Sequence, residues 1–81
     1  MKQILYFSAT WCGPCKMYAP TINEASNSVN IRKVDVDQEQ QLSQQHNVRS
    51  VPTLILVENG VEKARMMGVK SLTEIKNFYN Q

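Results

Sequence analysis

The only two cysteines of this 81-residue chain are Cys12 and Cys15. They follow the apolar run of residues 4–7 and precede a segment that can be helical. A thiol at such a junction lies near the unpaired N–H groups and the positive dipole end of the helix, which favour its anionic form. Lowering a thiol pKa from about 8.5 to about 7 requires roughly 2 kcal/mol, which a partly buried helix N-terminus nearly supplies. The spacing therefore predicts that one cysteine is a nucleophile.

Two other interpretations of the cysteine pair are a structural disulfide and a metal site. A permanent disulfide here would close a loop of only about four residues and contribute about 2 kcal/mol in the chain-entropy model. A tetrahedral zinc site needs four ligands, whereas the chain offers Cys12, Cys15, His46 and carboxylates without a second pair of cysteines. Both interpretations are weaker than a reactive dithiol.

The composition predicts a single globular domain over residues 1–81. The 42% hydrophobic content is ordinary for a folded chain of this length, which can bury roughly 60% of its unfolded surface. A net charge of +2, with scattered lysines and arginines, argues against nucleic acid or a membrane as a partner. The start of the chain carries only four clearly apolar residues together, too few for a signal peptide or a membrane span, so we expect a cytoplasmic protein.

The elements expected around the cysteines form an α/β fold. Strands are expected at residues 3–8, 30–36, 52–57 and 61–67, and helices at residues 14–28, from residue 37 to Asn47, and from residue 71 onward. The order is therefore βαβαββα, with the first two strands parallel through a crossover and the last two joined as a hairpin at Asn59-Gly60. This order predicts a four-stranded mixed sheet with helices on both faces.

Local signals predict how the helices begin and end. Asp37 with Gln40, and Ser71 with Glu74, are each spaced as a capping box. Asn47 is a plausible left-handed end of the second helix. Pro20 falls inside the first helix and should kink it.

Four further side chains are expected to have structural roles only. Met17 belongs to the loosely helical apolar pattern of the first helix. His46 is expected on the surface of the second helix, as neither ligand nor base. The pair Met66 and Met67 is expected to pack rather than to form a binding surface.

The segment Trp11-Cys12-Gly13-Pro14-Cys15-Lys16-Met17 resembles the active site of the thioredoxin family, and Val51-Pro52-Thr53 resembles the loop that this family places against it. The similarity extends over essentially the whole chain, and the element order matches. Thioredoxins of the usual length carry an extra strand and helix before the first strand expected here. The chain therefore resembles a short member that lacks them and is near glutaredoxin size.

The resemblance implies a mechanism for the two cysteines. Cys12, expected to be the exposed one, attacks a substrate disulfide, and Cys15 resolves the mixed disulfide. Trp11, Gly13 and Pro14 form the active-site turn. Trp11, Val51, Pro52 and Gly68 would bind the substrate. The Val51-Pro52 bond would be cis, leaving the Val51 backbone free to pair with an extended substrate and excluding metal from the thiols.

The position of Tyr6 departs from the family pattern. The family typically has a buried aspartate there, beneath the active site, which exchanges the proton of the second cysteine. A phenol, with an ordinary pKa near 10, cannot be such a base near neutral pH. Lys33, which resembles the family lysine near that aspartate, then lacks its partner and should turn outward. We group Tyr6, Lys16 and Lys33 as the residues expected to influence the thiol pKa values.

The function implied by the resemblance is reduction of protein disulfides by a monomer without a bound cofactor or metal. Its redox centre would be the Cys12–Cys15 disulfide. Electrons would come from a thioredoxin reductase that uses a nicotinamide cofactor, and ribonucleotide reductase is one plausible client. The alternatives are a glutaredoxin-like reductase recharged by glutathione, which the Gly13-Pro14 pair disfavours, and a non-catalytic subunit that clamps a larger enzyme.

Overall fold

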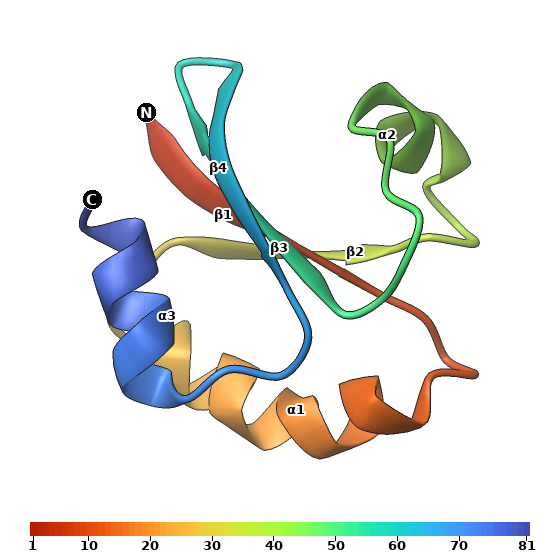
Figure 1. The fold of residues 1–81 in the computed structure, drawn as a ribbon, viewed down its shortest axis with the longest axis horizontal. Helices are drawn as coiled ribbons and strands as arrows, with labels where there is room; N and C mark the ends of the chain where they lie inside the picture. Colours follow the sequence, from red (N-terminus) through yellow and green to blue (C-terminus); the bar gives the residue numbers. More distant parts are fainter.

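The computed structural model describes residues 1–81, in which four strands and three helices follow one another in the predicted order (Figure 1). The elements are β1 (Lys2–Ser8), α1 (Gly13–Ala25), β2 (Ile31–Asp35), α2 (Gln40–Gln45), β3 (Thr53–Glu58), β4 (Val61–Met67) and α3 (Leu72–Tyr79). No helix has both the length and the apolar content needed to span a membrane.

The strands form one mixed sheet in the order β2-β1-β3-β4. Strand β1 is parallel to β2, to which α1 connects it, and antiparallel to β3. The β3–β4 hairpin turns at Asn59 and Gly60, with φ of 54° and 82°, because the tight turn needs positive φ at both central residues. The predicted α/β fold with a mixed sheet is confirmed.

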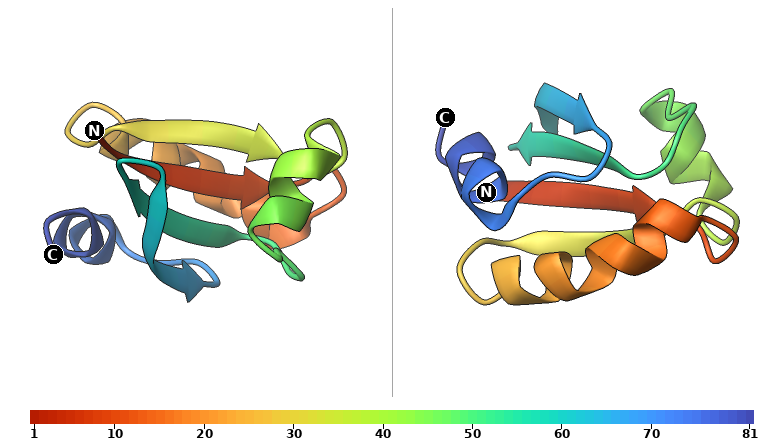
Figure 2. Two further views of the ribbon diagram at one scale, coloured as in Figure 1. Left: turned by 90° about the horizontal axis from the view of Figure 1, so that it is seen from above. Right: turned by 60° about the horizontal axis from the view of Figure 1, so that its bottom comes forward.

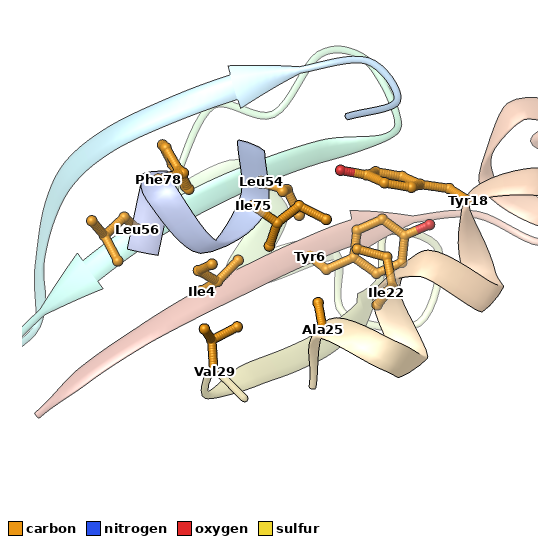
Figure 3. Close-up of a cluster of buried hydrophobic side chains, with 10 residues drawn as sticks. All are labelled: Ile4, Tyr6, Tyr18, Ile22, Ala25, Val29, Leu54, Leu56, Ile75 and Phe78. Atoms are coloured by element: carbon orange, nitrogen blue, oxygen red, sulfur yellow. The ribbon is translucent and has the colours of Figure 1, made fainter. Parts of the chain in front are cut away.

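Helices cover the two faces of this sheet, with α1 and α3 on one side and α2 on the other (Figure 2). Because side chains alternate along a strand, Ile4 and Tyr6 of β1 point to α1 and α3, whereas Leu5 and Phe7 point to the face of α2. The larger core cluster, drawn in Figure 3, consists of Ile4, Tyr6, Tyr18, Ile22, Ala25, Val29, Leu54, Leu56, Ile75 and Phe78.

The helix-end predictions have mixed outcomes. Ser71 and Glu74 form the reciprocal capping box at the start of α3, and Asn47 has the left-handed φ of 54°, as predicted. The predicted box at Asp37 is wrong, because α2 begins after Glu39 without a side-chain cap. Instead, the side chain of Gln40 donates to the Asp37 carbonyl at 3.2 Å. The Asp37 carboxylate is used elsewhere, at the site described below.

The first helix also differs from the prediction. It ends at Ala25 rather than near residue 28, and residues 26–28 form a turn. Met17 was expected in its apolar pattern, yet 81% of this residue is exposed. The buried face of α1 contains Cys15, Tyr18 and Ile22, and a residue two positions beyond Cys15 is rotated about 200° from it.

Two of the other structural roles are also corrected. Met66 packs against the core as predicted, but the next residue of the strand, Met67, points outward and is 59% exposed. The His46 side chain is only 11% exposed rather than on the surface. It lies beside Phe7, with ring centroids 6.1 Å apart, and its Nδ1 is 3.3 Å from the Glu62 carboxylate.

Candidate active site

Cys12 and Cys15 form a closed disulfide whose Cα atoms are 5.3 Å apart. Both residues are buried, with 3% and 4% of their surfaces exposed, so the expectation that Cys12 is the exposed cysteine is wrong for this oxidised state. In the closed disulfide, Cys12 and Cys15 form a small buried cluster with Ala9, against which Val51 packs. The exposed positions of the turn are Trp11, Gly13 and Pro14.

The local chain places Cys12 at the N-terminus of α1. The Cys12 N–H donates to the Ala9 carbonyl at 3.2 Å in the turn after β1. Cys12 is the N-cap residue, and its Sγ accepts the backbone N–H of Cys15 at 3.2 Å. Pro14 lies in the first turn, where the N–H that it lacks would have no partner in the helix. This geometry stabilises negative charge on the Cys12 sulfur when the disulfide opens.

The loop before β3 faces the disulfide. The Val51 carbonyl oxygen is 3.8 Å from Cys12 Sγ, and the Val51-Pro52 peptide bond is cis, as the family resemblance implied. Thr53 Oγ1 donates to the Ser50 carbonyl at 2.8 Å and braces the loop from within. The structure thus brings two sequence segments about 40 residues apart together around one sulfur.

Gly68 borders the same loop from the end of β4. Its N–H donates to the Pro52 carbonyl at 3.0 Å, and its φ is 87°, a conformation that favours glycine. A Cβ at this position would meet no atom of this chain within 4 Å, so within the chain it is the positive φ that favours glycine. Strand β4 ends just before Gly68, as predicted, and the register of the β3–β4 hairpin shifts between Leu56 and Val57.

The indole of Trp11 is 68% exposed beside the disulfide and is held by a hydrogen bond that was not predicted. Its Nε1 donates to Asp37 Oδ2 at 2.9 Å. Asp37 was assigned to a helix cap from its spacing to Gln40, and no local signal points to a partner 26 residues away. Next to the indole is a hollow of about 110 Å³ lined by Trp11, Val36, Val48, Arg49, Ser50 and Val51.

The Tyr6 side chain lies beneath the disulfide, as the family resemblance implied, and Tyr6 is 4% exposed. Its hydroxyl donates to the Cys15 carbonyl at 3.5 Å, and its ring makes an edge contact with Tyr18, with centroids 5.6 Å apart. Burial raises the Tyr6 pKa above its ordinary value, and the bond with the Ser8 side chain opposes this only in part. The phenol therefore stays neutral near neutral pH and cannot act as a base there.

The two lysines expected near the thiols are both exposed. Lys33 bonds to the Asn23 side chain, in agreement with the expectation that it turns outward when no buried acid is present. Lys16 directly follows Cys15 on α1. A cavity of about 250 Å³ lies between these lysines and the disulfide, and it is lined by Tyr6, Ser8, Ala9, Thr10, Cys15, Lys16, Ala19, Ile22, Asn23, Lys33 and Asp35.

The two cysteines that a zinc site would use are joined to each other in a disulfide. No three His, Cys, Asp or Glu residues are arranged to hold a metal ion. His46, the third possible ligand, instead contacts Phe7 and Glu62. The site is a buried disulfide at a helix N-terminus, flanked by an exposed indole and a cis-proline loop.

Comparison with known proteins agrees with this geometry. The Thioredoxin family model matches residues 1–81. The thioredoxin of Haemophilus influenzae is 44% identical over 82 residues, which cover 96% of this chain and 77% of that protein. The structure of a mutant thioredoxin from Halobacterium salinarum superposes with a TM-score of 0.89 at 31% identity, covering 98% of this chain and 72% of the other. The chain belongs to the thioredoxin family.

A third relative joins two activities in one chain. The bifunctional thioredoxin reductase/thioredoxin of Mycobacterium leprae is 41% identical over 68 residues, which cover 79% of this chain and 15% of that protein. The family, the fold and the adjacent cysteines together identify this chain as a thiol-disulfide oxidoreductase acting on proteins.

Proposed function

We propose that residues 1–81 form a single domain that reduces protein disulfides in the cytoplasm, with Cys12 as nucleophile and Cys15 as resolving thiol. The observation that carries this assignment is the position of Cys12 as the N-cap of α1. Its sulfur accepts the Cys15 N–H and faces the Val51 carbonyl, whereas Cys15 lies within the helix. The helix N-terminus therefore acts most strongly on Cys12.

In the first step, the Cys12 thiolate attacks one sulfur of the client disulfide. The client S–S bond breaks, a Cys12–client disulfide forms, and the departing client thiolate takes up a proton. The Cys15 thiol then loses its proton and attacks Cys12 Sγ. This step releases the second client thiolate and forms the Cys12–Cys15 disulfide seen in the structure, so two electrons pass to the client.

Client docking involves the residues that surround the disulfide on its open side. Trp11 offers a flat exposed ring, and Gly68 allows a client backbone to approach closely. Val51 lies outside β3, and its N–H takes part in none of the turn, loop or cap bonds of the chain. An extended client segment can therefore pair with the Val51 backbone beside Pro52, as a strand pairs with a free edge.

The electron donor in this proposal is a thioredoxin reductase that draws on a nicotinamide cofactor. Support comes from the Mycobacterium leprae relative, whose name combines the two activities in one chain. Ribonucleotide reductase, an enzyme that needs a dithiol donor, is one client to test. The proposed unit acts as a monomer.

Insulin reduction coupled to a thioredoxin reductase tests the proposal. We expect turnover by the wild type, no turnover by Cys12→Ser, and accumulation of a Cys12–client disulfide by Cys15→Ser. Retained turnover in Cys12→Ser would disprove the mechanism. Efficient recharging by glutathione alone would indicate a glutaredoxin-like enzyme. A biological effect that survives replacement of both cysteines would indicate a non-catalytic subunit.

The direction of electron flow needs a separate measurement. Equilibration with a dithiol buffer gives the reduction potential of the Cys12–Cys15 pair. A value near the approximately −270 mV of thioredoxins supports a reductase, whereas a value near about −120 mV indicates an oxidase.

A further inference from the structure

Exposed apolar side chains gather next to the disulfide. The large hydrophobic residues that are exposed in this chain are Met1, Trp11, Met17, Val61, Met67 and Val69. Three of them, Trp11, Met67 and Val69, lie in or directly beside the segments that border the disulfide. Met67 immediately precedes Gly68 and is 59% exposed, whereas its neighbour Met66 packs against the core.

Contacts place the Met67 thioether on the rim of the site. Met67 pairs with Thr53 across the sheet, at the start of β3. The Ser50 hydroxyl donates to Met67 Sδ at 3.7 Å, and the next residue, Val51, has its carbonyl 3.8 Å from Cys12 Sγ. The thioether is therefore one residue removed from the backbone that faces the reactive sulfur, and it is open to solvent.

We propose that Met67 is an oxidation site whose sulfoxide weakens docking of protein clients, an inference that rests on the proposed function. A peroxide is the oxidant class. Its O–O bond breaks, one oxygen atom forms an S=O bond on Met67 Sδ, and the other leaves as water, so that sulfur is oxidised by two electrons and peroxide is reduced by two. Because Met67 is exposed, peroxide can reach its side chain. Because Met67 lies on the rim of the disulfide site, its oxidation changes the surface on which a client docks.

The sulfoxide changes both the polarity and the hydrogen bonding of the rim. A thioether is a weak acceptor and a flexible apolar contact, whereas a sulfoxide is polar. The Ser50 hydroxyl, already directed at the sulfur, can bond to the new oxygen and hold the modified side chain against the Val51 loop. Removing one apolar contact from a small docking surface should lower kcat/KM for a protein client about three- to tenfold.

The experiment uses the full chain with its disulfide closed, which protects the cysteines during peroxide treatment. After the peroxide has been removed, mass spectrometry measures sulfoxide at each methionine. Insulin reduction and reduction of 2-hydroxyethyl disulfide are then assayed, and each protein is compared with its own untreated rate. Met17→Leu is the matched control, since Met17 is 81% exposed but lies on the outer face of α1.

We expect Met67 to be oxidised before Met66 in the wild type, with insulin kcat/KM reduced and the small disulfide reduced at an unchanged rate. Met17→Leu should show the same loss, whereas Met67→Leu should show none. Met67→Gln, a polar replacement, should lower insulin kcat/KM without any oxidant. The inference is overturned if Met67→Leu loses as much as the wild type, if oxidised Met67 leaves insulin reduction unchanged, or if Met67→Gln keeps full activity. Failure of the untreated wild type to reduce insulin would instead refute the proposed function.

Discussion

Replacing Tyr18 by phenylalanine should make the protein more resistant to alkaline unfolding. Tyr18 is fully buried between α1 and α3, and its hydroxyl oxygen has no hydrogen-bond partner within normal distance (Figure 3). Burial raises its pKa to about 12, and the nearby Tyr6 adds to this shift while the Lys70 backbone opposes it. The neutral phenol is therefore strongly favoured in the folded state.

The sign and size of the effect follow from linkage. In the unfolded chain, tyrosine ionises near pH 10, so the unfolded state loses its proton first as the pH rises. The contribution of Tyr18 is present in full below about pH 10 and is lost progressively up to about pH 12. A shift of about two pH units corresponds to a total of roughly 3 kcal/mol, of which about half is lost by pH 11.

Urea unfolding of the wild type and Tyr18→Phe at pH 8 and pH 11 measures this loss. At pH 8 we expect the two free energies of unfolding to differ by less than about 1 kcal/mol, because the hydroxyl that is removed has no partner. At pH 11 the variant should gain about 1 kcal/mol relative to the wild type, since lysine and arginine titrations are common to both proteins.

Tyr79→Phe is the control, because it removes the same group from a partly exposed position where the hydroxyl bonds to the Lys2 carbonyl at 3.3 Å. A gain at pH 11 that both variants share would come from loss of a phenol group in general and not from the burial of Tyr18. Equal pH dependence in the wild type and Tyr18→Phe would refute the reasoning, as it would show that the buried phenol does not oppose ionisation.

Three further predictions concern the site and its supporting elements. Tyr6→Asp should speed release of the client from its disulfide with Cys12 near pH 7, because a carboxylate beneath Cys15 can take the proton of Cys15. Loss of the buried ring should lower the free energy of unfolding by about 3–5 kcal/mol, so stopped-flow kinetics measure the release on the folded fraction. An unchanged release rate would count against the proton-transfer role. Asp37→Ala frees the Trp11 indole and should lower kcat/KM for insulin about two- to fivefold. Asp37→Asn keeps an acceptor oxygen and should retain most of the wild-type kcat/KM, and equal losses in the two variants would exclude the hydrogen bond as the cause. Ser71→Ala removes the N-cap of α3 and should lower the free energy of unfolding in urea by about 1 kcal/mol, with no change in kcat for insulin reduction. A loss of activity in the folded variant would show that α3 does more than support the core.

The cysteine turn and the order of elements could be predicted because their signals are local. The Asn59-Gly60 turn and the Ser71 capping box depend on residues a few positions apart, and both appear as predicted. The cis bond before Pro52 is different, since sequence statistics alone favour trans and only the family resemblance pointed to cis.

The wrong predictions share a physical cause. Asp37 has two possible partners, and the structure shows its carboxylate bonded to an indole that is distant in the chain rather than capping α2. Met17 and Met67 are as apolar as their buried neighbours, and only the rotation of a helix or the alternation of a strand decides which of them faces solvent.

The sequence by itself determined that two cysteines follow a buried strand and begin a helix, because strand, turn and helix form from neighbouring residues. Only the family resemblance placed the Tyr6 phenol beneath them. Tertiary structure decided the environment of the sulfurs. Packing of the Val51 loop against α1 buries Cys12, and the end of β4 brings Met67 to the same rim. These contacts join residues 17 to 39 positions apart, and their geometry depends on how the whole sheet packs.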